Sequence, residues 1–186
     1  LSSWRRLQKT SKLIHKSQPL HTSKSEDRVC GSCLYTYMSM SYPNISPLAS
    51  IHPEAKLGEG VIVHPFAVIE ENTQIAEGCI IESHAVIKSG ARLGKHCHIH
   101  SGAVISGIPQ DLKFVGEDSV AIIGDHTMVR ECVTVNRGTA SRGKTVVGSY
   151  CLLMAYSHVA HDCVLGDHVI LGNATQLAGE VEVDDY

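Results

Sequence analysis

The chain has few aromatic side chains, little net charge and no long apolar run. Aromatic residues make up 5% of its 186 residues, and the formal net charge is −3. Basic patches interleaved with stacking rings are therefore missing, and we expect no nucleic-acid partner. No stretch approaches the roughly 18 apolar residues that cross a bilayer, so we also expect no stable membrane insertion.

A helical hydrophobic period is missing as well. From Ile51 onward a branched aliphatic residue recurs every six positions, with three exceptions at Asp111, Glu117 and Ser141. Six is not a multiple of 3.6, which excludes an amphipathic helix as the cause of the pattern. A fixed short period is typical of a solenoid.

A second inward position supports this interpretation. Four residues after each aliphatic residue stands a small or β-branched one: Ala55, Ala67, Thr73, Cys79, Ala85, Ala91, Cys97, Ala103, Thr127, Val133, Cys151, Ser157 and Cys163. One bulky and one small position per hexad suit short strands stacked as the flat faces of a prism, three hexads to a turn. The sequence therefore predicts an all-β fold, the left-handed parallel β-helix. Its handedness is taken from hexapeptide-repeat proteins, because the period alone does not fix it.

The seven cysteines do not indicate disulfides. Four of them occupy the small inward position, where they alternate with Ala and Thr, so size explains them. We expect buried free thiols in a reducing compartment. Cys30 and Cys33 form a lone C-x-x-C pair without the second pair or βαβ context that a metal or redox site needs.

Residues 1–45 differ in composition from the rest. Residues 1–28 carry seven Lys or Arg and two acidic residues, whereas residues 29–186 carry nine basic and 17 acidic residues. Residues 1–37 resemble a transit peptide for organelle import, or they are upstream sequence before a start at Met38 or Met40, which we favour. Either way we expect a disordered tail over 1–45 and one domain over 46–186.

The hexads are interrupted twice, over residues 106–119 and 136–145, where Gly, Pro and charged residues replace aliphatic ones. Loops that leave a rigid column often carry function. The last residues stop in mid-repeat, which predicts that the domain is incomplete at its C-terminus.

Histidine is abundant, with 12 residues. Seven of them fall at outward positions, where a solvated polar side chain explains each of them singly: His52, His64, His84, His96, His100, His126 and His168. The segment 152–163 brings more titratable side chains together than the rest of the column, because His158 and His161 are three residues apart and Asp162 follows directly. An imidazole can take a hydroxyl proton near neutral pH, and a carboxylate fixes its tautomer.

Four ordered motifs add context: PQDLK-x-x-GE, RE-x-VT-x-NRGT, LLM-x-x-x-HVAHDC and N-x-T-x-x-AGE, all on the hexad pattern. From about residue 45 to 186 the chain closely resembles the UDP-N-acetylglucosamine O-acyltransferase family. The resemblance implies a cytoplasmic bacterial homotrimer that catalyses the first step of lipid A biosynthesis. It transfers a (3-hydroxy)acyl chain from acyl carrier protein to the 3-hydroxyl of UDP-N-acetylglucosamine. It implies no metal and no cofactor.

The resemblance also assigns site residues. It implies that His161 is the general base, that Asp162 orients it, and that the Gly179 N–H stabilises the oxyanion. Substrate-binding roles fall to His158 and, in the first loop, to Asp111 and Lys113. Glu180 stands where better-known members have histidine, so only a contact between its carboxylate and a sugar hydroxyl is expected there.

Three other functions compete. In a γ-type carbonic anhydrase, three histidines from two subunits hold zinc, and His158, His161 and one of His126 or His168 are candidates. The QDLK motif and the loops disfavour it. The N-acyltransferase of the same pathway shares the column but has another N-terminal domain. A non-catalytic scaffold is disfavoured because the loop motifs are retained.

Overall fold

The structure is a computed structural model that describes residues 44–186. Most of the expected tail, including Cys30 and Cys33, therefore lies outside the described residues. Within residues 44–186 all regular structure is β-strand, and no helix is present that could cross a membrane.

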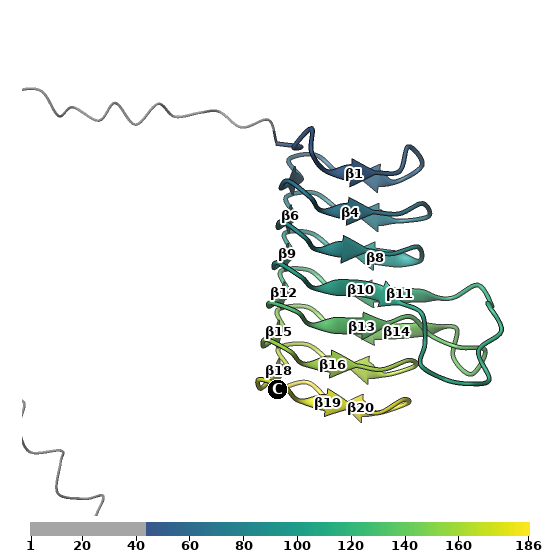
Figure 1. Cartoon of the computed structure of the whole chain (residues 1–186). Helices are drawn as coiled ribbons and strands as arrows, with labels where there is room; N and C mark the ends of the chain where they lie inside the picture. The colour runs from purple at the N-terminus through teal and green to yellow at the C-terminus, as the bar shows by residue number, and fades with distance from the viewer. Residues whose placement is uncertain (1–43) are drawn as a thin grey trace, which may run out of the picture. The chain divides into compact units, whose positions relative to one another are not determined.

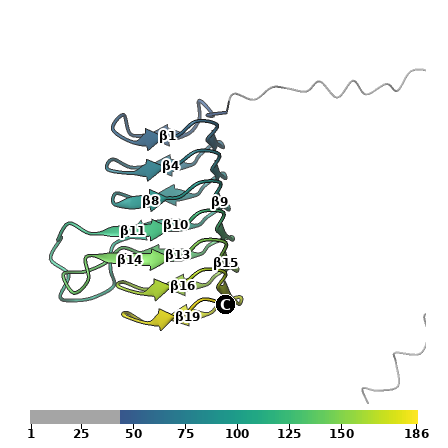
Figure 2. The same ribbon diagram turned by 180° about the vertical axis from the view of Figure 1, so that it is seen from behind.

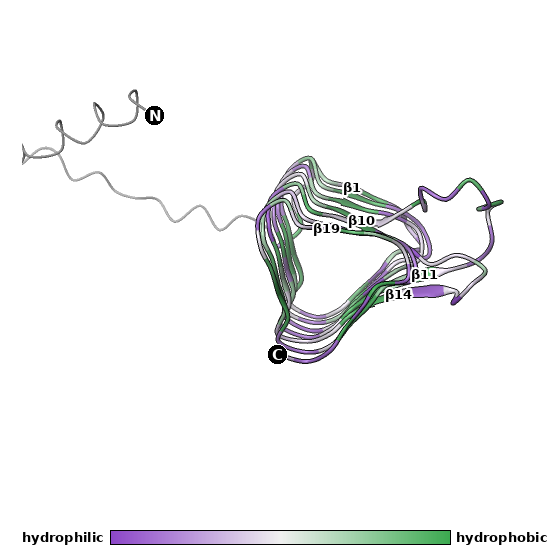
Figure 3. Cartoon of the chain, turned by 90° about the horizontal axis from the view of Figure 1, so that it is seen from below, coloured by the Kyte–Doolittle hydropathy of each residue, from purple (hydrophilic) through white to green (hydrophobic). Residues whose placement is uncertain are grey.

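Twenty short strands form three parallel sheets that are the three faces of one column (Figures 1 and 3). The first sheet contains β1 (Ser50–Ile51), β4 (Val68–Ile69), β7 (Val86–Ile87), β10 (Val104–Gly107), β13 (Thr134–Asn136), β16 (His158–Val159) and β19 (Gln176–Leu177). The second contains β2 (Lys56–Leu57), β5 (Gln74–Ile75), β8 (Ala91–Leu93), β11 (Val120–Ile123), β14 (Lys144–Val147), β17 (Val164–Leu165) and β20 (Glu182–Val183). The third contains β3 (Ile62–Val63), β6 (Ile80–Ile81), β9 (His98–Ile99), β12 (Met128–Val129), β15 (Leu152–Leu153) and β18 (Ile170–Leu171).

Consecutive strands belong to different faces, and each strand pairs with the strand one coil later. Ser50 is opposite Val68 and Ile62 is opposite Ile80, a separation of eighteen residues, or three hexads. This is the predicted left-handed parallel β-helix.

The aliphatic side chain of each hexad points into the column. Ile75, Ile81 and Ile87 are no more than 2% exposed, as predicted. The small inward positions are buried too, and the thiols of Cys79, Cys97, Cys151 and Cys163 are free, as predicted. Each of these four thiols donates a hydrogen bond to a backbone carbonyl oxygen of the next coil, so the cysteines serve as small core residues.

Two loops leave the column at one corner, between the first and second sheets (Figure 3). The first connects β10 to β11, and the second connects β13 to β14. Val104 is opposite Thr134, thirty residues later, and Val120 is opposite Lys144, twenty-four residues later. The loops therefore add twelve and six residues to a coil, both multiples of six. This explains why the hexad numbering stays in phase across both interruptions.

The corners require an unusual backbone conformation. The residue three positions after most inward aliphatic residues has a positive φ, and twelve of these corner residues are not glycine. A left-handed residue costs roughly 1–2 kcal/mol when it carries a Cβ. At the corner between the second and third sheets, rings stack from coil to coil with centroids 4.9–5.2 Å apart. The stacked rings are those of His96, His126, Tyr150 and His168.

Candidate functional site

Both extruded loops leave the corner between the first and second sheets (Figures 1 and 2), where they meet three corner residues, His161, Gly179 and Glu180. An open cavity of about 590 Å³ is lined there by Gln110, Asp111, Leu112, Lys113, His161, Gly179 and Glu180. A smaller cavity of about 240 Å³ adjoins it and is lined by Asp111, Lys113, Glu117, Thr139, Ala140, Ser141 and Glu180. Loop and column thus supply opposite walls of one site.

His161 and Asp162 form a hydrogen-bonded pair at the corner that follows β16. The distance between His161 Nδ1 and Asp162 Oδ2 is 2.9 Å, and the His161 side chain is 18% exposed whereas that of Asp162 is fully buried. Among residues 44–186 no group hydrogen-bonds to His161 Nε2, the ring nitrogen beside the Gly179 wall of the cavity.

The second loop surrounds the Asp162 carboxylate with donors. The backbone N–H of Thr139 donates to both carboxylate oxygens, at 3.0 and 3.1 Å, and its hydroxyl donates to Oδ2 at 2.6 Å. The Arg142 N–H donates to Oδ1 at 3.2 Å. Burial alone would raise the pKa of Asp162, but these bonds, with that from His161, outweigh it and hold the pKa below its ordinary value.

The ionised state of Asp162 determines the tautomer of His161. An ionised carboxylate only accepts hydrogen bonds, so Nδ1 must carry the proton of a neutral imidazole. The lone pair is then on Nε2, facing the cavity. This is the arrangement of a general base whose orientation is fixed by a buried carboxylate.

Gly179 is a glycine because the imidazole lies against it. A Cβ at this position would lie 2.5 Å from Cε1 and 2.7 Å from Nε2 of His161, closer than real contacts allow. Gly179 therefore lies beside the His161 ring, at the wall of the same cavity. The neighbouring Glu180 is exposed, and its Oε1 accepts a hydrogen bond from the Ser141 hydroxyl at 3.0 Å.

The first loop is held in shape by its own carboxylates. Asp111 Oδ1 accepts the Lys113 N–H at 2.9 Å, which leaves the exposed Lys113 side chain free to enter the cavity. Glu117 links the loops, because its two oxygens accept the N–H groups of Val115 and Ala140. The Glu117 backbone first, and then the N–H groups of Val115 and Ala140, lower the pKa of this carboxyl, so it remains a charged link between the loops.

His158 is placed differently from the other expected site residues. It points outward from β16, its Nδ1 lies 2.7 Å from the Thr134 hydroxyl, and it does not line the cavity. Burial lowers its pKa, and an interaction with the Thr134 backbone only partly opposes this effect. The structure thus groups Asp111, Lys113, His161, Gly179 and Glu180, with Asp162 behind them and His158 on the adjacent face.

Gln110 and Thr139 are among the site residues to which the sequence assigns no role. Gln110 lines the cavity and Thr139 holds Asp162. Gln110 belongs to the PQDLK motif and Thr139 to the NRGT motif, and their place in these motifs is the feature of the sequence that points to them.

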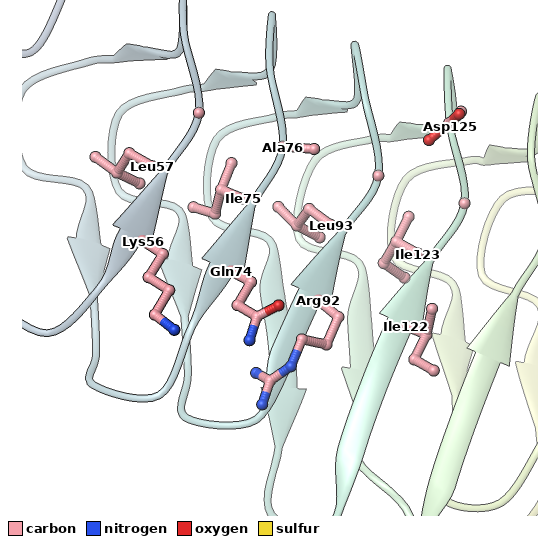
Figure 4. Close-up of a pocket in the computed structure, with 13 residues that line it drawn as sticks. Lys56, Leu57, Gln74, Ile75, Ala76, Arg92, Leu93, Ile122, Ile123 and Asp125 are labelled. Atoms are coloured by element: carbon pink, nitrogen blue, oxygen red, sulfur yellow. The ribbon is translucent and has the colours of Figure 1, made fainter.

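The histidines considered for a zinc site do not converge within one chain. His158 lies on the first sheet, His161 at the corner after it, and His126 and His168 in the stacked row between the second and third sheets. A further groove of about 580 Å³ runs along the second sheet (Figure 4). It contains no histidine, and Asp125, its one carboxylate, already accepts the Lys95 N–H. That groove therefore offers no base.

Residues 72–107 and 144–179 match the family described as "Bacterial transferase hexapeptide (six repeats)". An acyl-[acyl-carrier-protein]–UDP-N-acetylglucosamine O-acyltransferase of Pseudomonas savastanoi pv. phaseolicola is 53% identical over 77 residues, 41% of this chain and 30% of the relative. Among solved structures, the UDP-N-acetylglucosamine acyltransferase LpxA of Bacteroides fragilis is 52% identical with a TM-score of 0.73, covering 75% of this chain and 55% of that one. That of Francisella novicida is 40% identical with a TM-score of 0.75, covering 76% and 52%.

The chain thus spans about half the length of these solved relatives and less than a third of the curated one. Across that span, the fold and the sequence are similar to the same group of proteins. The chain is a hexapeptide-repeat protein that is similar, over this span, to UDP-N-acetylglucosamine O-acyltransferases.

Proposed function

We propose that this chain is the part of an O-acyltransferase that activates the acceptor hydroxyl. The enzyme takes the acyl chain from acyl carrier protein and transfers it to the 3-hydroxyl of UDP-N-acetylglucosamine. This reaction is the first step of lipid A biosynthesis in the bacterial cytoplasm. The observation that carries the proposal is the unpaired Nε2 of His161, whose Nδ1 is bound to a buried, ionised carboxylate.

His161 Nε2 takes the proton of the sugar hydroxyl as its oxygen attacks the thioester carbonyl carbon. The negative charge moves to the carbonyl oxygen, where the Gly179 N–H is the donor we assign to it. The C–S bond then breaks, and the imidazolium returns its proton to the thiolate. The products are the sugar ester and the free carrier thiol. Because the thioester is already activated, a base, one oxyanion donor and correct positioning suffice, without metal or cofactor.

The loop residues suit the acceptor. A nucleotide sugar brings a diphosphate, which the Lys113 ammonium can pair with, while Asp111 and Glu180 can accept hydrogen bonds from sugar hydroxyls. Glu180 would repel a phosphate, so we assign it to the sugar side of the cavity. His158, on the adjacent face, is assigned a contact with substrate parts outside the cavity.

We further propose that the protein acts as a homotrimer. Outward apolar side chains support this proposal, because Met128 is 37% exposed and Ile170 on the same face is 58% exposed. Light scattering on the purified protein tests it, and a fully active monomer would contradict it.

The function is tested with purified protein, acyl carrier protein loaded with a 3-hydroxyacyl chain and UDP-N-acetylglucosamine, with the product followed by mass spectrometry. General-base assistance is worth roughly 10²–10⁴-fold, so His161→Ala should reduce turnover by that factor. His168→Ala, an exposed histidine in the stacked row, is the matched control and should keep full turnover. Full activity of His161→Ala would reject the assignment of the base.

A further inference from the structure

A second cluster of histidines and carboxylates lies at another corner, between the third and first sheets. Glu82 follows β6, His98 begins β9, and His100 follows β9, so two neighbouring coils contribute. One ligand atom from each of the three lies within 4.8 Å of those of the other two. In the part of the chain that the structure describes, this is the one group of three such side chains that converges in this way.

The convergence is centred on one carboxylate oxygen. Glu82 Oε1 lies 2.9 Å from His98 Nε2 and 3.3 Å from His100 Nδ1. The other oxygen, Oε2, accepts the Ser101 N–H at 3.2 Å and the Ser101 hydroxyl at 3.0 Å. Ser101 therefore fixes the carboxylate with Oε1 turned toward both rings. Metal-binding carboxylates are typically held by hydrogen bonds of this kind.

The rings are also fixed and partly shielded from water. The two imidazoles stack with centroids 4.1 Å apart. The side chain of His100 is 14% exposed, that of Glu82 25% and that of His98 31%. The hexad pattern predicts an outward, solvated His100, but the structure places it in this partly buried cluster.

The charges of the cluster favour a bound cation. Glu131 Oε1 lies 3.6 Å from His100 Nδ1, so two carboxylates face the two imidazoles. Arg130, which follows β12 at the same corner, pairs with Glu131 through two bonds of 3.0 and 3.1 Å. Among the described residues, no Lys or Arg pairs with Glu82.

We propose that Glu82, His98 and His100 bind one divalent transition-metal ion, with Zn²⁺ as the ion that best suits them. Two imidazole nitrogens and one carboxylate oxygen are ligands that zinc accepts at about 2.0–2.2 Å, with water in the remaining position. Small movements of the side chains are enough to bring atoms 2.9–3.3 Å apart around a common ion. The ion would connect successive coils, and the site is separate from His161 and from the acyltransferase proposal.

The test is zinc binding by the full chain, measured by competition with a chromophoric zinc chelator after removal of metal. Because any thiol outside the core can compete for zinc, these are removed first by Cys30→Ser, Cys33→Ser and Cys132→Ser. One Zn²⁺ per chain is expected. Ser101→Ala should weaken binding about tenfold, and His98→Ala or Glu82→Gln should weaken it more than about 100-fold. Absorption spectroscopy at the zinc edge should show two imidazole ligands.

The matched control is His84→Ala, an exposed histidine at the same corner whose ring stacks on Phe66 outside the cluster. It should bind zinc as the parent does. Glu82→Gln keeps size and hydrogen bonding, and circular dichroism checks that each variant is folded. Absence of saturable binding by the parent, or equal binding by folded Glu82→Gln, overturns the proposal.

Discussion

At the level of single residues, the position of the His161 imidazole depends on Gly179 having no side chain. Gly179 has no Cβ, and the His161 imidazole occupies the space that a Cβ would need. The conformation of Gly179 is not left-handed, so alanine is acceptable to the backbone and the conflict is with the ring alone.

Gly179→Ala should therefore displace the imidazole and reduce kcat about 100-fold, the typical cost of a 1 Å misplacement, with little change in melting temperature. Gly172→Ala is the control, because the nearest atom to its added Cβ is Thr175 Oγ1 at 3.7 Å. Steady-state kinetics and NMR of the imidazole nitrogens measure both effects. An unaltered kcat in Gly179→Ala would contradict this account.

Thr139 is the second residue on which the base depends. Thr139→Val removes the hydroxyl donor to Asp162 but keeps the size of the side chain, and should cost about 1–3 kcal/mol of unfolding free energy at pH 7. Because the pKa of Asp162 is lowered in the folded state, its contribution is present above the ordinary carboxyl pKa and is lost as pH falls through the lowered value.

The difference in unfolding free energy between Thr139→Val and the parent should therefore be largest at neutral pH and should become smaller below about pH 4. Thr139→Ser, which keeps the hydroxyl, should follow the parent at every pH. Urea unfolding at several pH values tests this expectation. A loss of the same size at all pH values would mean that Thr139 acts through packing and not through the Asp162 charge.

At the level of the strands, each short element presents one side chain to the core and one to the outside. In β6 the inward Ile81 is fully buried and its neighbour Ile80 is half-buried on the outer face. The pair allows the same substitution to be made on both sides of one strand.

Ile81→Asp should cost several kcal/mol, because it places an unpaired charge in a stacked aliphatic column. Ile80→Asp, one residue away, should cost much less because its carboxylate can reach water. Chemical denaturation with circular dichroism compares the two. Equal losses of unfolding free energy would show that Ile81 and Ile80 do not lie in a buried and a solvent-facing position, as the structure describes.

The hexad pattern predicts nearly every strand, because each one is set by its own inward aliphatic residue. The loops were recognised from composition alone, since their twelve and six added residues leave the count in phase. Their limits were less certain: β10 extends to Gly107 and β14 begins at Lys144, inside the predicted interruptions. His161 and Asp162 could be predicted as neighbours in sequence. The contact of Asp162 with Thr139 could not, because it depends on the path of the second loop.

At the level of the whole molecule, the strands of each coil pair only with those of the coil before and the coil after it, whereas the second loop reaches further, to Glu180. Stability in such columns is close to a sum of coil terms and nearest-neighbour terms. Aliphatic residues of the first and last described coils, such as Ile51 and Val183, are only partly buried, whereas Ile99 and Val129 are fully buried.

Hydrogen exchange should therefore be slowest in β6, β9, β12 and β15 and faster toward β1 and β20. Mass spectrometry of peptides from each coil measures the gradient, and its dependence on denaturant separates local opening from global unfolding. Uniform protection along the column would indicate a single cooperative unit instead of coupled neighbours.

Because successive coils stack with the same spacing, the distance between two coils along the column axis is a whole number of equal steps. Each coil raises the chain by one strand spacing, about 4.8 Å. Residues 51–104 contain no extruded loop, so a duplication or deletion of eighteen residues there would move β1 relative to the His161 corner by one step. The hydrogen bonds, the core and the geometry of the site would be unchanged. The distance between the first coil and the site can therefore be changed by whole coils while the chemistry of the site stays the same.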